Sequence, residues 1–497
     1  MTVATKILMG SGAVAESAYE INQSLIFDDD SSAYLTRTPS SASNRKTWTW
    51  SSWVKRANLN PSGLVGLFGA CDGNAVNATW IGFGTNDSLA SIAADGNVAL
   101  VTTAVFRDVS AWYHIVFVYD STQGTASNRQ KIYVNGVQET SFSTSNYPNQ
   151  NLDSFINSNV QHSLGARTRP AGAIVTFFDG YLAETNFIDG TALTPSSFGE
   201  TNSATGQWIP KEYSGSYGTN GFYLKFVSGA LGTDSSGEGN NYTAANLANS
   251  DVVPDSPTNN FATYDPNVPT SYYVFSEGNL KVTVPNQWRI TIASMGVSTG
   301  KWYWEQLVSS GTQNTHFGFC DDSAFFLDAG NYVGYKPGSW SYAGSNGKLY
   351  NNGGIIGSTL TVTSTDGGKI GIAMDLDNQK VWFSLNGTWM GTNANPSTGA
   401  GAAITNIVAG DTYYPATTVY GLSSTANFGQ NGTFSGVATA GGNADTNGIG
   451  DFFYAVPTGF KALCTANLPD PAIPLPSAHF NTVLYTGNGG TNAITGV

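Results

Sequence analysis

The sequence predicts an all-β protein made of tandem antiparallel β-sandwiches joined by extended linkers. Three observations predict it: 11% of the 497 residues are charged, 58 residues are Gly, and 12% are aromatic. Short strands joined by many turns have this composition, because aromatic side chains suit a pleated, half-buried surface whereas Gly and Asn occupy tight turns. Long helical repeats of Glu, Lys, Leu and Ala are missing from the sequence.

The charge balance and the lengths of the apolar runs each argue against one kind of partner. The chain has 21 Lys and Arg residues against 34 Asp and Glu residues, which gives a formal net charge of −13. A nucleic-acid-binding protein needs a basic surface that displaces counterions from phosphates. No apolar run approaches the roughly 20 residues that cross a bilayer. We therefore expect no nucleic-acid partner and no insertion into a membrane.

The cysteines and the N-terminus indicate folding in a reducing cytoplasm. Cys71, Cys320 and Cys464 are odd in number and far apart, so we expect buried free thiols rather than a disulfide framework. A single Lys6 precedes the apolar N-terminal run, which Gly10 and Gly12 interrupt. This pattern does not favour a secretory signal peptide.

The tryptophans divide the chain into two modules. Six lie between positions 48 and 208, and six lie between positions 288 and 389. Residues 251–271, between the two groups, contain four Pro residues and no regular alternation. Such a segment is typical of an extended connector.

Alternation with a period of two predicts the strands of the first module. TWTWSSWV (47–54) places Trp48 and Trp50 on one face, and both faces of WYHIVFVYD (112–120) are apolar, as in an inner strand. KIYVNGVQE (131–139) reads as a hairpin that turns at Asn135-Gly136. FFDGYLAETNFIDG (177–190) predicts a further strand.

Taken in this order after SAYLTRTP (32–39), these segments resemble a laminin-G or pentraxin-type jelly roll of the concanavalin A-like group. The resemblance covers residues 24–212. It implies two packed antiparallel sheets, a fold that often binds carbohydrate and sometimes calcium at one rim.

Five segments of the second module resemble a SPRY domain over residues 271–430. They are GKWYWEQLV (300–308), THFGFCDD (315–322), VGYKPGSWSYAGSNGKLYNNGG (333–354), GGKIGIAMDLDNQKVWFSLNGTW (367–389) and YYPATTVYGLSSTANFG (413–429). The predicted turns at Asp377-Asn378 and Asn386-Gly387 support a β-sandwich. The resemblance implies a binding module without enzymatic activity.

The expected organisation has five parts. Residues 1–23 form an attachment arm, 24–212 the jelly roll, 213–270 a strand plus a Pro-rich connector, 271–430 the SPRY-like sandwich, and 431–497 a Gly/Pro-rich linker into a further domain.

No catalytic pattern is present, so we expect no enzyme. Retaining glycanases of this fold place carboxylates at alternate positions of one strand, and none of the nine Glu residues begins such a run. Glu184 and Glu305 stand alone and suit structural roles, and the four His residues suggest no triad.

We also expect no cofactor. The acidic runs FDDDSS (27–32) and FCDDSAFFLD (319–328) offer oxygen ligands to calcium, but acidic turns that cap strands are the commoner use of such runs.

Trp340, Tyr342 and Trp389 are the candidate ligand-binding residues. They occur in turn-rich segments, where exposed rings at the rim of a sandwich would stack on sugars. The alternative, in which these rings cap the core, stays open.

The whole arrangement resembles fibre or appendage proteins of tailed marine bacteriophages. That resemblance implies a virion protein that folds in the host cytoplasm, assembles as a homotrimer, attaches to other virion proteins through the N-terminal arm and binds a host-surface polysaccharide or receptor. The alternatives are a bacterial secreted or cell-surface adhesin and, less favoured, a polysaccharide depolymerase.

Overall fold

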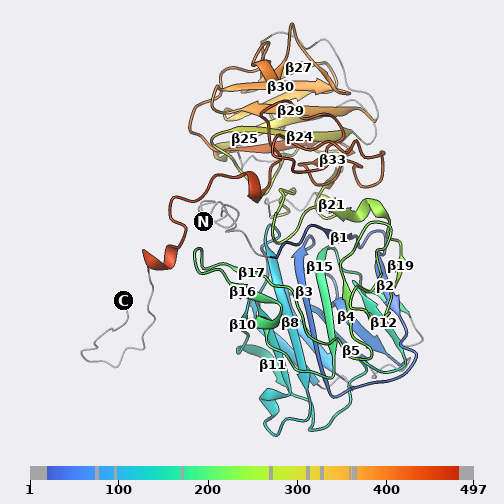
Figure 1. Ribbon diagram of the computed structural model, residues 1–497. Helices are drawn as coiled ribbons and strands as arrows, with labels where there is room; N and C mark the ends of the chain where they lie inside the picture. Colours follow the sequence, from blue (N-terminus) through green and yellow to red (C-terminus); the bar gives the residue numbers. More distant parts are fainter. Residues whose placement is uncertain are drawn as a thin grey trace.

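The computed structural model describes residues 19–72, 78–93, 98–169, 173–267, 273–308, 314–324, 330–357, 360 and 367–480. Over these residues the chain forms two β-sandwiches stacked end to end (Figure 1), which confirms the predicted all-β class. The described helices are short 3-10 turns, and none of them is long and apolar enough to span a membrane. They are η2 (Ala126–Asn128), η4 (Pro195–Ser197), η5 (Asn249–Asp251), η6 (Asp322–Ala324), η7 (Pro396–Thr398), η8 (Thr465–Asn467) and η9 (Pro476–Ala478).

The first sandwich consists of two facing antiparallel sheets. One contains, in spatial order, β10 (Val137–Gln138), β9 (Gln130–Val134), β8 (Trp112–Asp120), β3 (Thr47–Arg56), β15 (Gly180–Asp189), β1 (Ser24–Phe27) and β20 (Val252–Val253), and β18 (Phe222–Leu224) also pairs with β15. The other contains β11 (Phe142–Asn146), β7 (Val98–Val105), β6 (Ser88–Ala93), β5 (Ala78–Phe83), β4 (Val65–Cys71), β12 (Gln161–Leu164), β2 (Tyr34–Arg37) and β19 (Thr243–Ala245). Two small hairpins, β13 (Arg167–Thr168) with β14 (Ile174–Val175) and β16 (Gly199–Thr201) with β17 (Trp208–Pro210), complete the module.

The predicted alternation of β3 builds the core of this sandwich. Trp48 and Trp50 lie on the same face and are buried; Trp48 stacks on Tyr119 with ring centroids 5.4 Å apart. The hairpin turn at Asn135-Gly136 is also confirmed, with φ angles of 48° and 80°. Both values belong to the left-handed region that this tight turn requires.

Residues 213–270 add strands to the first sandwich before the chain continues into the second. β18 pairs with β15, β19 pairs with β2, and β20 pairs with β1, so the segment adds strands to both sheets. Part of the predicted N-terminal arm also packs here: Tyr19 shares a 2.8 Å hydrogen bond with the hydroxyl of Tyr223, and Ile21 is buried. Residues 1–18 of that arm lie outside the described residues.

The second sandwich also has two antiparallel sheets. One contains β21 (Val274–Ser276), β22 (Lys281–Val284), β33 (Leu422–Asn427), β24 (Lys301–Val308), β29 (Lys369–Asp375), β30 (Lys380–Leu385) and β31 (Thr388–Trp389). The other contains β23 (Thr291–Ile292), β32 (Tyr413–Val419), β25 (Thr315–Asp321), β26 (Ser339–Ala343), β27 (Lys348–Asn351) and β28 (Gly354–Ile356).

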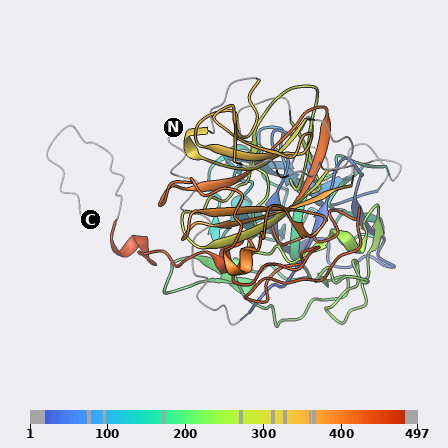
Figure 2. The same ribbon diagram turned by 90° about the horizontal axis from the view of Figure 1, so that it is seen from above.

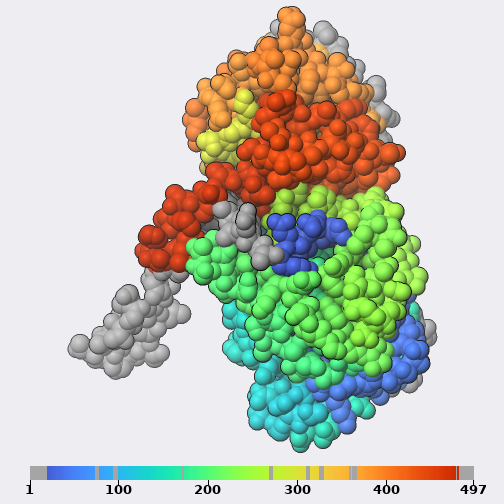
Figure 3. Space-filling view, in the orientation of Figure 1, coloured from blue at the N-terminus to red at the C-terminus, as the bar shows by residue number. Residues whose placement is uncertain are grey.

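The chain after β33 folds back onto this sandwich, where the sequence predicts a linker. Phe452, Phe460 and Cys464 are fully buried and pack in one cluster with Trp382 of β30. Few charges and scattered aromatics between Gly and Pro residues gave no periodicity from which this packing could be predicted. In Figure 3 the segment forms a red band between the two sandwiches, whereas Figure 2 shows η9 outside them.

The two sandwiches share a buried polar joint. Lys55 of β3 lies with its Nζ 2.8 Å from Oδ2 of Asp255, and both side chains are buried. The same Nζ donates to the Asn260 side chain and to the Phe261 carbonyl. Trp112 of β8 donates its indole N–H to the other oxygen of Asp255 at 3.1 Å. The sequence predicted only that the connector is extended. The buried salt bridge between Lys55 and Asp255 also binds it to the first sandwich.

We expect Asp255→Asn to lower the free energy of unfolding by about 3–5 kcal/mol, because it leaves the ammonium group of Lys55 buried without its counter-charge. Chemical denaturation of the whole chain measures this loss. The matched control is Asp153→Asn, which breaks an exposed pair with Arg45 at 3.7 Å and should cost about 0–1 kcal/mol. Equal losses in the two variants would contradict the prediction.

Candidate functional site

The sequence left two alternatives for Trp340 and Tyr342, exposure at a rim and packing in the core, and the structure places both rings inside the second sandwich. Both belong to β26, an inner strand between β25 and β27, and their exposed fractions are 5% and 0%. Being two residues apart, they point to the same face and pack into the space between the two sheets. Trp340 stacks on Phe319 with centroids 5.3 Å apart. These two rings are therefore core residues and cannot stack on a sugar.

Trp389 lies at the edge of the second sandwich, in β31. Its side chain is half-buried and meets Tyr303 edge to face, with centroids 6.3 Å apart. It packs against the same cluster as Phe452, so the C-terminal segment covers part of it.

An aromatic groove of about 440 Å³ lies instead on the first sandwich, beside the joint between the two modules. Its aromatic lining comes from Trp53, Trp112, Tyr113 and Trp208, which belong to β3, β8 and β17. Trp53 and Trp112 are buried, so Tyr113 and Trp208, which are half-buried, offer the accessible ring surface. Residues of the connector, among them Asn260, and of the C-terminal segment also line this hollow. We call this hollow the aromatic groove. Its volume falls within the range that holds a small ligand such as an oligosaccharide unit.

Stacking and hydrogen bonding fix the walls of the aromatic groove. The ring of His114 stacks on Trp53 with centroids 4.8 Å apart and on Trp208 with centroids 6.0 Å apart. The indole N–H of Trp208 donates to Nδ1 of His114 at 3.0 Å. The hydroxyl group of Ser51 forms a 2.8 Å hydrogen bond with Nε2 of the same ring. Because Nδ1 accepts a hydrogen bond, the proton of the neutral ring is on Nε2, which donates to Ser51.

Burial keeps the imidazole of His114 neutral. It lowers the pKa of His114 to about 3, far below the value of 6.5 for a free imidazole. A charged ring would also repel the indole N–H that now donates to it. The histidine that stacks on Trp53 and Trp208 is therefore uncharged at neutral pH.

Polar groups line the same groove. They are Asp108, Asn135, Gln207 and Asn260. Asp108 accepts hydrogen bonds from Ser110 through Oδ1, and Asn135 accepts one from the backbone of His114. Gln207 and Asn135 are exposed, which leaves amide groups at the mouth of the groove. Rings next to amides and a carboxylate can bind the apolar face and the hydroxyl groups of a sugar together.

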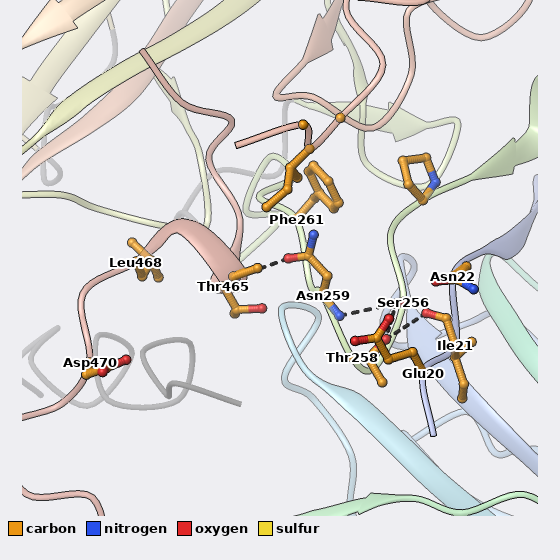
Figure 4. A pocket seen from close by; sticks show the side chains of 15 residues that line it. Glu20, Ile21, Asn22, Ser256, Thr258, Asn259, Phe261, Thr465, Leu468 and Asp470 are labelled. Atoms are coloured by element: carbon orange, nitrogen blue, oxygen red, sulfur yellow. Dashed lines mark hydrogen bonds between the residues drawn. The ribbon is translucent and has the colours of Figure 1, made fainter. Parts of the chain in front are cut away.

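A second hollow, of about 720 Å³, also borders the connector (Figure 4). The N-terminal segment contributes Glu20 and Asn22, the connector Ser256 and Asn259, and the C-terminal segment Asp470. Among the described residues that line it, Phe261 is the one aromatic residue, and it is fully buried. The described lining of this hollow therefore offers no accessible ring face comparable to those of Tyr113 and Trp208 in the aromatic groove.

Of the two isolated glutamates, Glu305 has the structural role that the sequence predicts. Glu305 of β24 is buried and accepts hydrogen bonds from Tyr303, Asn427 and the backbone N–H groups of Phe453 and Tyr454. Burial raises its pKa. Its carboxylate therefore fastens the C-terminal segment to the sandwich.

The three cysteines are buried free thiols, as predicted. The acidic run at 319–328 falls partly outside the described residues; within them, Asp321 accepts hydrogen bonds from the backbone and hydroxyl of Ser323, as an acidic turn does.

Sequence reasoning missed the aromatic groove, although one signal pointed to it. Trp53 is out of phase with Trp48 and Trp50, so it lies on the face of β3 that points away from the core. That face otherwise carries polar residues such as Ser51 and Lys55. Inspecting the two faces of the predicted strand separately would have shown this tryptophan on an otherwise polar face, which indicates a binding surface.

Comparisons with known proteins agree with the two sandwiches. Residues 29–197 match the concanavalin A-like lectin/glucanases superfamily, and residues 301–431 match the SPRY domain family. The chain contains a concanavalin A-like jelly roll followed by a SPRY domain. Such domains typically bind rather than catalyse, so the concanavalin A-like/SPRY chain has the make-up of a binding protein. A search of curated proteins finds no match.

Solved structures similar to the concanavalin A-like/SPRY chain fall into the same two groups. The SPRY domain of human HERC1 is 21% identical over 33% of this chain and 96% of that chain, with a TM-score of 0.27. A candidate carbohydrate binding protein from Bacteroides ovatus is 17% identical over 46% of this chain and 58% of that chain, with a TM-score of 0.31. The native heptameric SAP-like pentraxin from Limulus polyphemus is 16% identical over 36% of this chain and 80% of that chain, with a TM-score of 0.27.

We expect the contribution of His114 to stability to be complete above pH 6.5 and to be lost as the pH falls toward 3. The reason is that the unfolded chain, with a pKa of 6.5, binds a proton that the folded ring rejects. His114→Gln keeps an acceptor for Trp208 but does not titrate. The stability advantage of the wild type over this variant should shrink by at most about 1.4 kcal/mol per pH unit in this window.

Denaturation curves at pH 7 and pH 4.5 measure the change. The control is His479→Gln, which removes a histidine from an exposed position where no buried contacts are lost. An unchanged gap for His114→Gln would show that the ring is protonated in the folded state.

Proposed function

We propose that this protein binds carbohydrate through the aromatic groove of its concanavalin A-like sandwich. The observation that carries the proposal is the pair of half-buried rings Tyr113 and Trp208 beside exposed amides in one hollow of about 440 Å³, whose lining the buried rings of Trp53 and Trp112 complete. The groove lies next to the joint with the SPRY domain, and Asn260 of the connector forms part of its lining. Ligand binding therefore involves the first sandwich and the connector together.

The groove favours binding over hydrolysis. Hydrolysis of a glycosidic bond needs two carboxyl groups that flank it, about 5–9.5 Å apart. Asp108 is the one carboxylate among the described residues that line the groove, and its Oδ1 accepts two hydrogen bonds from Ser110. We therefore expect the protein to bind a polysaccharide without releasing reducing ends from it.

We expect Trp208→Leu to weaken polysaccharide binding about tenfold, because removing one aromatic face costs about 1 kcal/mol or more. Gln207→Ala, at an exposed position, should weaken binding less and leave the melting temperature unchanged. A glycan array identifies the ligand, and isothermal titration with that ligand compares the variants. Melting temperatures recorded in parallel separate lost contacts from lost folding.

The matched control is Trp389→Leu, which removes a half-buried tryptophan of the SPRY sandwich. This variant should bind the ligand as the wild type does. If Trp389→Leu weakens binding and Trp208→Leu does not, the ligand site lies on the SPRY domain and the aromatic groove is not the site.

The wider proposal is that the protein is displayed on a bacteriophage appendage, as a homotrimer attached through its N-terminal residues. It rests on the resemblance of the whole sequence to such appendage proteins and on a binding groove that suits a host-surface glycan. Several shallow sites on one particle would raise avidity by about 10²–10⁴ over a single site. Weak individual sites would then be sufficient for attachment to a cell.

We expect antibodies against this chain to label virions at an appendage, and the mass of the purified protein in solution to equal three chains. Electron microscopy with gold-labelled antibody and light scattering test the two points. Labelling of the surface of uninfected bacteria would instead support a bacterial adhesin, and a monomeric mass would contradict the trimer.

A further inference from the structure

The described lining of the aromatic groove contains one charged side chain, that of Asp108, and no Lys, Arg or His. This side chain is half-buried. Its Oδ1 accepts hydrogen bonds from the backbone N–H of Ser110 at 2.9 Å and from the Ser110 hydroxyl at 2.6 Å. Asp108 belongs to none of the ion pairs among the described residues. Within this part of the chain, no ion pair therefore neutralises its negative charge at the groove.

Two basic side chains from the segments that form the groove bind other acids instead. Arg107, which precedes Asp108 in the chain, places its Nε 2.8 Å from Oδ2 of Asp87. Lys55 of β3 is the buried partner of Asp255. The charges of these two cations are thus already balanced, so neither offers the groove a free positive charge that could bind an acidic ligand.

The phenol group of Tyr113 lies beside Asp108. The backbone N–H of Asp108 donates to the Tyr113 hydroxyl at 3.1 Å. Burial and, after it, the charge of Asp108 raise the pKa of Tyr113 to about 12, so the phenol is neutral at neutral pH. An ammonium group is attracted both to a carboxylate and to the face of a neutral aromatic ring. Together the two side chains suit a ligand that carries an ammonium group.

The second hollow has the same sign of charge as the aromatic groove. Thr465 lines both hollows, and its backbone N–H donates to the Asn260 carbonyl at 2.9 Å. The exposed residues Glu20 and Asp470 line the second hollow, whose described lining also contains no Lys, Arg or His. A ligand that is longer than the groove and extends past Thr465 therefore meets further negative charge.

We propose that the aromatic groove selects polysaccharides whose sugars carry free amino groups. This inference rests on the proposed carbohydrate binding and adds the charge of the ligand to it. The ammonium group of such a sugar pairs with Asp108 while the sugar ring stacks on Tyr113 or Trp208. A uronic acid in the same place would bring two negative charges together, which costs free energy. The net charge of −13 acts in the same direction, because it raises the local concentration of cationic ligands.

Isothermal titration of the whole chain with two matched hexasaccharides tests the proposal. One is the hexamer of glucosamine, and the other is the hexamer of N-acetylglucosamine, which has the same rings and linkages but no charge. At about pH 5.5, where the amino groups are protonated, the glucosamine hexamer should bind about three- to tenfold more tightly. Asp108→Asn should remove this preference and leave the affinity for the N-acetylated hexamer unchanged, because the amide oxygen still accepts the hydrogen bonds from Ser110.

The matched control is Asp322→Asn, at an exposed position of the SPRY domain, which changes the net charge equally and should keep the preference. Hexalysine, which carries the charge without the sugar rings, should bind more weakly than the glucosamine hexamer. Equal affinities of the wild type for the two hexamers would overturn the proposal. So would an equal loss of preference in Asp108→Asn and Asp322→Asn, or hexalysine that binds as tightly as the sugar.

The same titrations separate this inference from the proposed function. If the protein binds the N-acetylated hexamer or another neutral glycan and does not prefer the amino sugar, carbohydrate binding stands and the selection for amino groups is wrong. If neither the two hexamers nor any glycan of the array binds, both proposals are wrong.

Discussion

The buried pair of Lys55 and Asp255 is the interaction on which the arrangement of this molecule depends. Neither charge reaches water, so each is tolerable only while the other stays within 2.8 Å. The connector must therefore follow β3 closely before the SPRY domain begins. Trp112, which lines the aromatic groove, donates a hydrogen bond to the same carboxylate. Asp255 therefore holds both the groove and the joint between the domains in place. A disturbance of the joint would reach the groove directly.

Local patterns account for the parts of the fold that the sequence predicted. An Asn-Gly turn flanked by alternating apolar residues leaves few alternatives, and the hairpin at Asn135-Gly136 has the expected backbone angles. Apolar residues on both faces of β8 likewise indicated an inner strand, and Ile115 and Val116, which point to opposite faces, are both fully buried. These features depend on neighbours within a few positions, which a single sequence contains in full.

The candidate site depended on contacts that no local pattern encodes. Trp340 stands among Gly and Ser residues, and only the pairing of β26 with β25 and β27 places its ring in the core. The aromatic groove needs Trp53, Trp112 and Trp208 to meet across more than 150 positions. Periodicity can mark a face as unusual, as it does for Trp53, but pairing across the sheet decides which residues meet on that face.

The fastening of the C-terminal segment by Glu305 changes what counts as a folding unit in this chain. The SPRY match ends at residue 431, yet the carboxylate of Glu305 accepts hydrogen bonds from Phe453 and Tyr454. A fragment cut at the family boundary would leave that buried acid short of donors and would uncover Trp382, which now packs on Phe460. The family match thus ends before the packed core does. A fragment that keeps the whole core of the SPRY sandwich needs about 30 more residues, through Cys464.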